Sequence, residues 1–492
     1  MLGAGPKQPM PTCRSDTKCS GRVIRKIAWR LVYDGHWPER RCFGDRRRRP
    51  VLGGGLEISS IESKLRQMAE VAQMDFGGRQ MRESPYPLLE VDDALRMIVE
   101  LTPVLEREEV DLAASVGRIL AQEAIADYDM PAAATSAVDG YALHPDSTLG
   151  PYMVLGESAA GHPFEGTLAR GQAVRVMTGG LVADGAESVV MVEHCRIVDR
   201  QLWLAHEPKS GANIIGRARD LRQGQVVIAP GRPIGAAEMG LLAMVGCTRP
   251  LVFRRPRVGI VSTGDELVEP DLRELRPGQV RDSNRFALIG AVTDAGAIAN
   301  WLGMVGDEPA RLRTALEKAI AENDVLLTSG GVSVGAHDYV KPLLEELGKV
   351  HFGRIKFKPG KPLTFVTFDS GRVGFGLPGF PVSSLVSFEV FVRPALLKMQ
   401  GHHNLSRPQV RVILADDVTP TPDRTEFQRV IVGWHHGGLV AHSTGDQGSS
   451  RLASMLGANA LAVIPAGSQR LAAGSEVDAW LLGPPGSQDP DS

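Results

Sequence analysis

Residues 325–333 read Val-Leu-Leu-Thr-Ser-Gly-Gly-Val-Ser, so a short apolar run passes directly into small and hydroxylated residues. The apolar run predicts a buried strand of a parallel sheet. Glycines after such a strand let successive backbone amides approach an anion, and the helix that follows adds the positive end of its dipole. The pattern also fits a glycine-rich turn without a ligand, but its two glycines and three hydroxyls favour phosphate binding.

Strands and helices are predicted to alternate on both sides of this segment. The predicted strands are Val258–Val261, Val325–Leu327 and Val373–Leu377, and the predicted helices follow Ser283, span Pro309–Ile320 and lie near Val382–Val392. This alternation predicts a doubly wound α/β domain over residues 257–402, with its ligand beyond the carboxyl ends of the strands.

The flanking segments have different patterns. Val91–Leu101 has the spacing of an amphipathic helix, with Leu95, Ile98 and Val99 on one face, whereas later segments hold short β-type runs between Gly, Pro and Asp. The predicted divisions are an extension at 1–83, a mixed region formed by 84–129 and 212–256, a β-rich insertion at 130–211, the α/β domain at 257–402 and a small all-β domain at 408–484.

Charge separates the extension from the rest of the chain. The first 50 residues hold 13 Lys or Arg and 4 Asp or Glu, a surplus of +9. Because the net charge of the whole chain is −2, the remaining residues carry a charge of −11. This balance gives the whole chain no bulk attraction to nucleic acid or anionic membranes. The extension fits a disordered basic arm, an organelle transit peptide, or a translation start at Met68, Met74 or Met81.

The cysteine content and the hydropathy of the chain indicate in which cellular compartment the protein is expected. The five cysteines form no CxxC pair, which argues against a disulfide framework or a zinc site. No run reaches the roughly 18 apolar residues of a membrane span, and no secretory signal is visible. We therefore expect no transmembrane segment and a cytoplasmic location, with organelle targeting left open.

Two further polar segments are predicted to reach the ligand edge of the sheet. Residues 262–267, Ser-Thr-Gly-Asp-Glu-Leu, follow a strand and suit Mg²⁺ and phosphate, although an ordinary polar turn fits equally well. Residues 358–362, Lys-Pro-Gly-Lys-Pro, hold two lysines on a stiff loop. Fixed ammonium groups bind an oxyanion such as molybdate well, but a solvated basic turn is the alternative.

Two other segments are less specific. Residues 376–383, Gly-Leu-Pro-Gly-Phe-Pro-Val-Ser, break a strand and begin a helix, so their backbone donors face the same edge or form only a structural elbow. Residues 136–142, Ser-Ala-Val-Asp-Gly-Tyr-Ala, fit a packed turn within the insertion. The residues by themselves thus indicate an α/β domain that binds phosphate and oxyanions, with acidic metal candidates.

The ordered set of motifs resembles the MoeA and gephyrin E-domain family of molybdopterin molybdenumtransferases over about residues 84–482. The segments that carry the resemblance are Asp139–Ala142, Met177–Gly179, Ser262–Leu267, Arg281–Arg285, Thr328–Ser333, Lys358–Pro362 and Gly376–Gly379. Ser443-Thr444-Gly445 and Ser449-Ser450-Arg451 are similar to the eukaryotic branch in particular.

The resemblance implies an architecture and a reaction. It implies a dimerisation region at 84–129 plus 212–256, a β-rich insertion, a molybdopterin-binding α/β domain and a C-terminal β-barrel, assembled as a homodimer. The substrates would be adenylylated molybdopterin and molybdate, and the products molybdenum cofactor and AMP, with Mg²⁺ as cofactor.

Site roles follow from the resemblance residue by residue. The implied catalytic residues are Asp139, Glu266, Asp307 and Asp338, of which Glu266, Asp307 and Asp338 would bind the metal. Substrate and nucleotide binding is implied for Thr178, Asp220, Ser329, Gly330, Gly331 and Ser333, and molybdate binding for Lys358, Lys361, Pro362, Arg429 and Ser450. The chain departs from the usual family pattern at Ala134, Thr135, Val138, Ala336-His337, Phe380 and Gln428.

Two other functions remain open at this point. One is a gephyrin-like scaffold that clusters receptors, which would need an apolar groove for a partner peptide. The other is a molybdopterin adenylyltransferase, whose α/β unit is similar, although only one Thr-Ser-Gly-Gly segment is present. If the chain is the insertase, a separate adenylyltransferase chain is an expected partner.

Overall fold

The computed structural model describes residues 86–144, 148–331 and 339–486. The predicted extension at 1–83 and two predicted site residues, Ser333 and Asp338, lie outside these ranges. Within them, no helix combines the length and the apolar character that crossing a membrane requires.

A six-stranded sheet organises the α/β domain, in the order β16-β13-β17-β21-β20-β18. Its strands are β13 (Arg257–Thr263), β16 (Ile298–Val305), β17 (Val325–Ser329), β18 (Lys349–Phe352), β20 (Thr364–Thr367) and β21 (Val373–Leu377). The first four strands in the spatial order are parallel, and β20 runs antiparallel to both of its neighbours. The chain goes from β13 out to β16 and returns to β17 on the other side, so the predicted doubly wound α/β class is confirmed.

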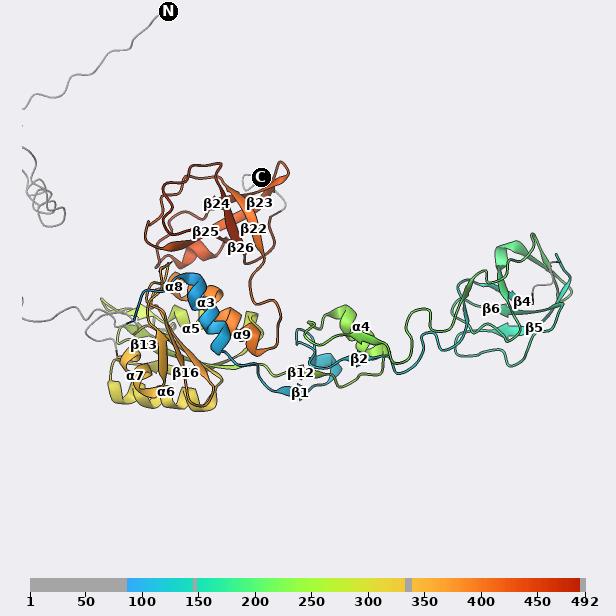
Figure 1. Ribbon diagram of the computed structural model, residues 1–492, viewed down its shortest axis with the longest axis horizontal. Helices are drawn as coiled ribbons and strands as arrows, with labels where there is room; N and C mark the ends of the chain where they lie inside the picture. The colour runs from blue at the N-terminus through green and yellow to red at the C-terminus, as the bar shows by residue number, and fades with distance from the viewer. Residues whose placement is uncertain (1–85, 145–147, 332–338, 487–492) are drawn as a thin grey trace, which may run out of the picture. The chain divides into compact units, whose positions relative to one another are not determined.

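Helices cover both faces of this sheet because successive strand residues point to opposite sides. Ile260 packs in a core with α5 (Ser283–Asp294), α8 (Pro381–Ser387) and α9 (Arg393–Met399), whereas the next residue, Val261, packs against α6 (Pro309–Glu322) and α7 (Val340–Leu347). Figure 1 shows α6 and α7 together along one side of β13 and β16. The unbroken apolar run of β13 is therefore that of a strand buried on both faces.

The predicted helix Val91–Leu101 is present as α3, and it adds to the core of the α/β domain. Its buried residues are Val91, Ala94 and Ile98, so the buried face is turned relative to the one we expected from Leu95 and Val99. A further difference concerns the predicted helix near 382–392, because residues Phe388–Val392 form a π-helical turn and the chain continues into α9.

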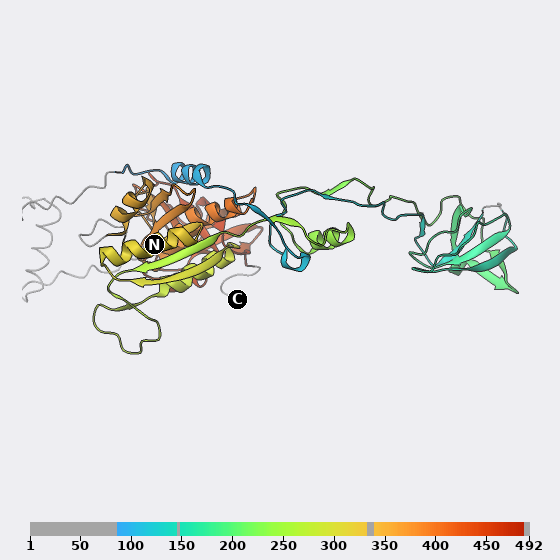
Figure 2. The ribbon, with the colours of Figure 1, turned by 90° about the horizontal axis from the view of Figure 1, so that it is seen from below.

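Two all-β or mixed regions precede the α/β domain. One contains the pairs β1 (Arg107–Glu109) with β12 (Leu251–Phe253) and β2 (Ala124–Ile125) with β11 (Val226–Ile228), together with α4 (Ala236–Met244). The other is a sheet in the order β7-β4-β6-β5-β9-β8, which Figure 2 shows as a compact β unit. Its strands are β4 (Gly140–Leu143), β5 (Tyr152–Ser158), β6 (Gln172–Val176), β7 (Ser188–Met191), β8 (Cys195–Val198) and β9 (Gln201–Leu204). The short pair β3 (Thr135–Ser136) with β10 (Ile214–Ile215) joins the two chain segments that lead to it.

The C-terminal strands close into a barrel. They are β22 (Gln409–Leu414), β23 (Thr425–His435), β24 (Gly438–Ser443), β25 (Ala460–Ile464) and β26 (Glu476–Leu481), and β23 pairs with both β24 and β25. A sixth short strand, β19 (Phe357–Lys358), leaves the α/β domain and pairs in parallel with the start of β23. The core below this junction joins the two domains, since Phe357 contacts Phe391 of the α/β domain and Phe427 of the barrel.

Candidate active site at the carboxyl edge of the sheet

Four loops meet at the edge where β13, β16, β17 and β21 end. The backbone N–H of Gly264 donates to the carbonyl of Val305 at 3.2 Å, and that of Gly330 donates to the carbonyl of Leu377 at 3.1 Å. These bonds join the loops after neighbouring parallel strands. The edge therefore collects most of the segments that the sequence analysis associated with phosphate and metal binding.

The glycine loop after β17 has a backbone that side chains would disturb. Gly330 and Gly331 have φ of +93° and +68°, values that favour glycine. A Cβ atom on Gly330 would lie 2.7 Å from the carbonyl oxygen of Thr263, and one on Gly331 would overlap Val340. With no side chains in the way, a ligand can approach the backbone of this loop closely, although the Gly330 N–H is already bonded to the Leu377 carbonyl.

Asn284, in the first turn of α5, ties the glycine loop to the loop after β21. Its Nδ2 donates to Ser329 Oγ at 2.7 Å and to the Gly379 carbonyl at 2.8 Å, and the residue is 8% exposed. Sequence reasoning gave Asn284 no role. The available signal was the helix start Asp282-Ser283-Asn284, in which Asp282 caps α5 by accepting from the Arg285 N–H.

Acidic residues gather between the ends of β13 and β16. Asp265 Oδ1 accepts the backbone N–H of Asp307 at 3.0 Å, and the carboxylate of Glu266 folds back over Gly264, where a Cβ atom would lie 2.8 Å from its Cδ. The structure thus brings Glu266 and Asp307 to one corner and adds Asp265, which sequence reasoning did not select.

These carboxylates fit a magnesium ion only if substrate completes its shell. Across the described ranges, no group of three or more His, Cys, Asp or Glu side chains is close enough to hold a metal. Mg²⁺ commonly binds through one or two carboxylates together with substrate phosphates and water. The donor chemistry of Glu266 and Asp307, next to the glycine loop, matches that arrangement.

The two lysines of the 358–362 loop have different surroundings. The Lys358 ammonium lies 2.9 Å from Glu426 Oε1 and 2.9 Å from Thr421 Oγ1, so its charge is shared with a carboxylate of the barrel. Burial raises the pKa of Glu426, but hydrogen bonds from Thr421, Gln428 and Lys358 outweigh it and hold that pKa below its usual value. Lys361 is exposed, followed by the half-buried Pro362, and has no ion pair among the described residues. Lys361 is therefore the ammonium with charge to offer an oxyanion.

Arg429 lies inside the barrel and organises the loop that carries Ser450. The residue is 1% exposed, and its guanidinium donates to Ser454 Oγ at 3.1 Å and to the carbonyls of Asp446 and Gly448 at 3.3 Å. That loop reaches the α/β domain, because the Ser449 carbonyl accepts the Val382 N–H of α8 at 3.1 Å. Ser450 is exposed on this loop beside α8.

The remaining predicted residues belong to the β-rich insertion and its connection. Asp139 Oδ1 accepts the Thr178 N–H at 2.7 Å and the Thr178 hydroxyl at 2.8 Å, and these bonds lower the pKa of Asp139. The structure thus pairs Asp139 with Thr178, both exposed. Asp220 is exposed as well, and its N–H donates to the Met130 carbonyl.

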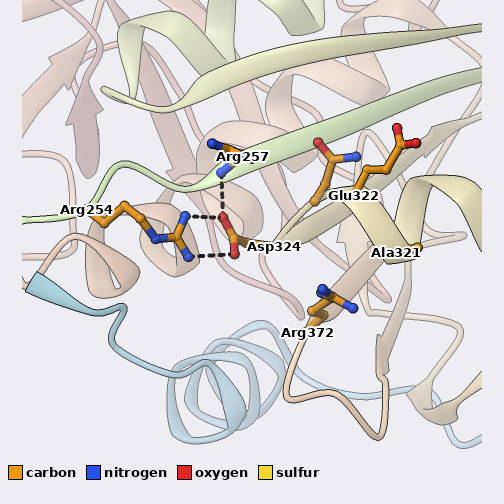
Figure 3. Close-up of a pocket in the computed structure, with 7 residues that line it drawn as sticks. Arg254, Arg257, Ala321, Glu322, Asp324 and Arg372 are labelled. Atoms are coloured by element: carbon orange, nitrogen blue, oxygen red, sulfur yellow. Dashed lines mark hydrogen bonds and ion pairs between the residues drawn. The ribbon is translucent and has the colours of Figure 1, made fainter. Parts of the chain in front are cut away.

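A cleft of about 470 Å³ lies at the opposite end of the sheet, where β13, β17 and β21 begin (Figure 3). Arg254 makes two hydrogen bonds to the Asp324 carboxylate, at 2.8 and 2.9 Å, and the Arg257 N–H donates to the same group at 2.7 Å. Burial raises the pKa of Asp324, but these donors outweigh it and lower the pKa below its usual value. These bonds attach Arg254, just before β13, and Arg257, the first residue of β13, to Asp324 just before β17.

Family models cover the described chain in three consecutive pieces. Residues 89–246 match the MoeA N-terminal region (domain I and II), residues 259–398 a probable molybdopterin binding domain, and residues 411–482 the MoeA C-terminal region (domain IV). A molybdopterin molybdenumtransferase of Nostoc is 37% identical over 410 residues, which are 80% of this chain and 94% of that protein. The chain belongs to the MoeA family.

Other MoeA relatives agree in extent and fold. Two solved structures of molybdopterin biosynthesis MoeA proteins from Pyrococcus match with TM-scores of 0.71 and 0.69, at 29% and 28% identity, and cover 81% and 80% of this chain. Gephyrin of Dictyostelium discoideum is 34% identical over 83% of this chain, but the chain spans only 64% of its length. The family resemblance inferred from the motifs is thereby confirmed, and this MoeA protein is a member of a transferase family.

Proposed function

We propose that this chain inserts molybdenum into molybdopterin, using adenylylated molybdopterin and molybdate and releasing molybdenum cofactor and AMP. The observation that carries the proposal is the carboxyl edge of the sheet, where four different loops supply a glycine loop, two carboxylates and the Lys361 ammonium, which has no ion pair within the described ranges. It is supported by relatives named molybdopterin molybdenumtransferase that match over almost their whole length.

Different residues of this edge would bind the phosphate, the Mg²⁺ ion and the molybdate. The Gly331 amide and the Ser329 and Ser333 hydroxyls would bind the phosphate, and Gly330, whose N–H is held by the Leu377 carbonyl, would leave room for it. Glu266 and Asp307, together with Asp338, would hold Mg²⁺, which supplies positive charge against the phosphoanhydride oxygens. Lys361 would bind molybdate with Pro362 and Ser450 beside it, while Lys358 and Arg429 position the loops that carry these groups.

The insertion residues require a second subunit in this proposal. Asp139 and Thr178 form one hydrogen-bonded pair, and we propose that the insertion of one protomer, including Asp220, completes the site of its partner in a homodimer. A closed symmetric dimer would contain two such sites. The protein would also meet a separate adenylyltransferase chain that supplies its substrate, and would work in the cytoplasm.

The decisive test is AMP release from adenylylated molybdopterin by the full chain with Mg²⁺, with and without molybdate. We expect AMP release that depends on molybdate, accompanied by active molybdenum cofactor. Substrate that binds but is never turned over would contradict an insertase and would favour a binding or scaffold role instead.

A further inference from the structure

Phe380 presents an aromatic ring at the candidate active site without packing it into the protein. It is 61% exposed and precedes α8 at the carboxyl edge of the sheet. Other large aromatic side chains nearby, such as Phe375 and Phe388, are fully buried. The exposure of Phe380 is therefore a local feature of this loop.

The backbone that carries the ring is held at three consecutive carbonyls. The Pro378 carbonyl accepts from Ser384 Oγ, the Gly379 carbonyl accepts from Asn284 Nδ2 at 2.8 Å, and the Phe380 carbonyl accepts from the Ser384 N–H at 2.9 Å. Prolines on both sides, Pro378 and Pro381, restrict the loop further. Because the backbone is already fixed, only the side-chain torsions of Phe380 lose freedom when a ligand packs on the ring.

The surroundings of the loop show which kind of ligand would meet the ring. A Cβ atom on Gly379 would lie 3.7 Å from Gly330 Cα, so the residue before Phe380 adjoins the glycine loop that is suited to phosphate. On the other side, α8 contacts the barrel segment that follows Ser450 (Figure 1). A phosphate bound at the glycine loop would therefore lie beside the residue that precedes Phe380.

We infer that Phe380 is a stacking platform for the aromatic heterocycle of a phosphate-bearing substrate, a specificity determinant that rests on the proposed function. Every nitrogen heterocycle has a π-face that an aromatic side chain can cover, and such contacts contribute without reading hydrogen-bond patterns. In the proposed substrate this heterocycle is either the adenine or the pterin, and both carry a phosphate.

The experiment compares three monophosphates by calorimetric titration of the full chain: AMP, neopterin monophosphate and ribose 5-phosphate. Phe380→Leu keeps the apolar bulk but removes the π-face. It is expected to weaken binding of one aromatic monophosphate by about 5- to 150-fold. Binding of ribose 5-phosphate should not change, and Phe380→Trp should restore the lost affinity. Whichever ligand is weakened, AMP or the pterin, identifies the ring that stacks.

The controls separate the possible failures. Trp434→Ala removes another exposed aromatic side chain, on the barrel, and should alter none of the three affinities. Unchanged affinity of Phe380→Leu for both aromatic ligands, or an equal loss for ribose 5-phosphate, would overturn the stacking role while leaving the phosphate site intact. A wild-type chain that binds none of the three would instead overturn the proposed function, and the stacking role with it.

Discussion

At the scale of single residues, the two lysines of the 358–362 loop are expected to respond differently to substitution. Lys361→Ala should raise the molybdate concentration needed for half-maximal AMP release by about tenfold or more, because a charge-assisted contact contributes roughly 1.5–3 kcal/mol. AMP affinity should stay within about twofold, since the phosphate is bound elsewhere. Steady-state kinetics with varied molybdate and AMP titration measure the two quantities; equal losses in both would contradict the assignment.

Lys358→Ala should act on stability instead. The variant leaves the Glu426 carboxylate, whose side chain is only 3% exposed, without its ammonium partner. We expect a loss of about 1–3 kcal/mol in the free energy of unfolding. Urea denaturation of Lys358→Ala beside Lys361→Ala checks this, because the exposed Lys361 should give almost no change.

These two lysines also show how far sequence reasoning reaches. The spacing and the prolines place both ammonium groups on one loop, and Glu266 follows a strand that its apolar run predicts. Asp307 follows β16, a strand that was not predicted. The partner that neutralises Lys358 lies 68 residues further along the chain, in another domain. No local pattern reveals such a contact, and the same holds for Asn284, whose acceptors are 45 and 95 residues away.

At the scale of elements, the start of α5 fixes the relation between two ligand loops. Asn284→Ala removes both donors, so the Gly379 carbonyl loses its partner, and the free energy of unfolding should fall by about 1–3 kcal/mol. AMP affinity should fall as well, because the glycine loop and the 378–380 loop are no longer tied. Asn300→Ala is the matched control: it removes a 2.7 Å hydrogen bond from β16 to Asn323 at the end of α6 and should lower stability without changing AMP affinity.

Elements with strong local signals were predicted well from the sequence. Val373–Leu377 is a strand with the predicted bounds, and Pro309 begins α6 as its missing N–H allows. The antiparallel strands β18 and β20 were not predicted, because short half-apolar runs near turns carry little periodicity. Ala94 is buried in place of Leu95 because α3 packs against α9. The position of α9 cannot be inferred from the sequence of α3 alone.

At the scale of the whole molecule, the Arg254–Asp324 pair makes stability depend on pH. The folded-state pKa of Asp324 lies below its usual value, so its contribution is present above the unfolded pKa near 4 and is lost as pH falls through the folded pKa. Asp324→Asn should therefore lower the free energy of unfolding by about 1.5–3 kcal/mol at pH 7. Denaturation at several pH values should show this difference shrinking below about pH 4; a constant difference would exclude the ion pair as its source.

A mixing experiment tests the proposed shared site. Assayed at a molybdate concentration that limits the Lys361→Ala variant, Asp139→Asn and Lys361→Ala should each show little activity. If the insertion of one protomer serves the α/β site of its partner, co-expression gives mixed dimers with one intact site of two, and about a quarter of wild-type activity returns. If each protomer uses its own insertion, every site carries a substitution and no activity returns.

The parallel pairing of β19 with β23 has a consequence for premature termination. Phe357 packs against Phe427, which in turn packs against Trp480, so the last strands of the chain complete a hydrophobic interior that begins far upstream. A nonsense or frameshift change between residues 400 and 424 would leave Phe357 uncovered and the edge of β19 unpaired, and a later one before residue 480 would remove Trp480 from the same interior. Such alleles should yield aggregated or degraded protein that quality control removes, and not a shorter enzyme with weaker molybdate use.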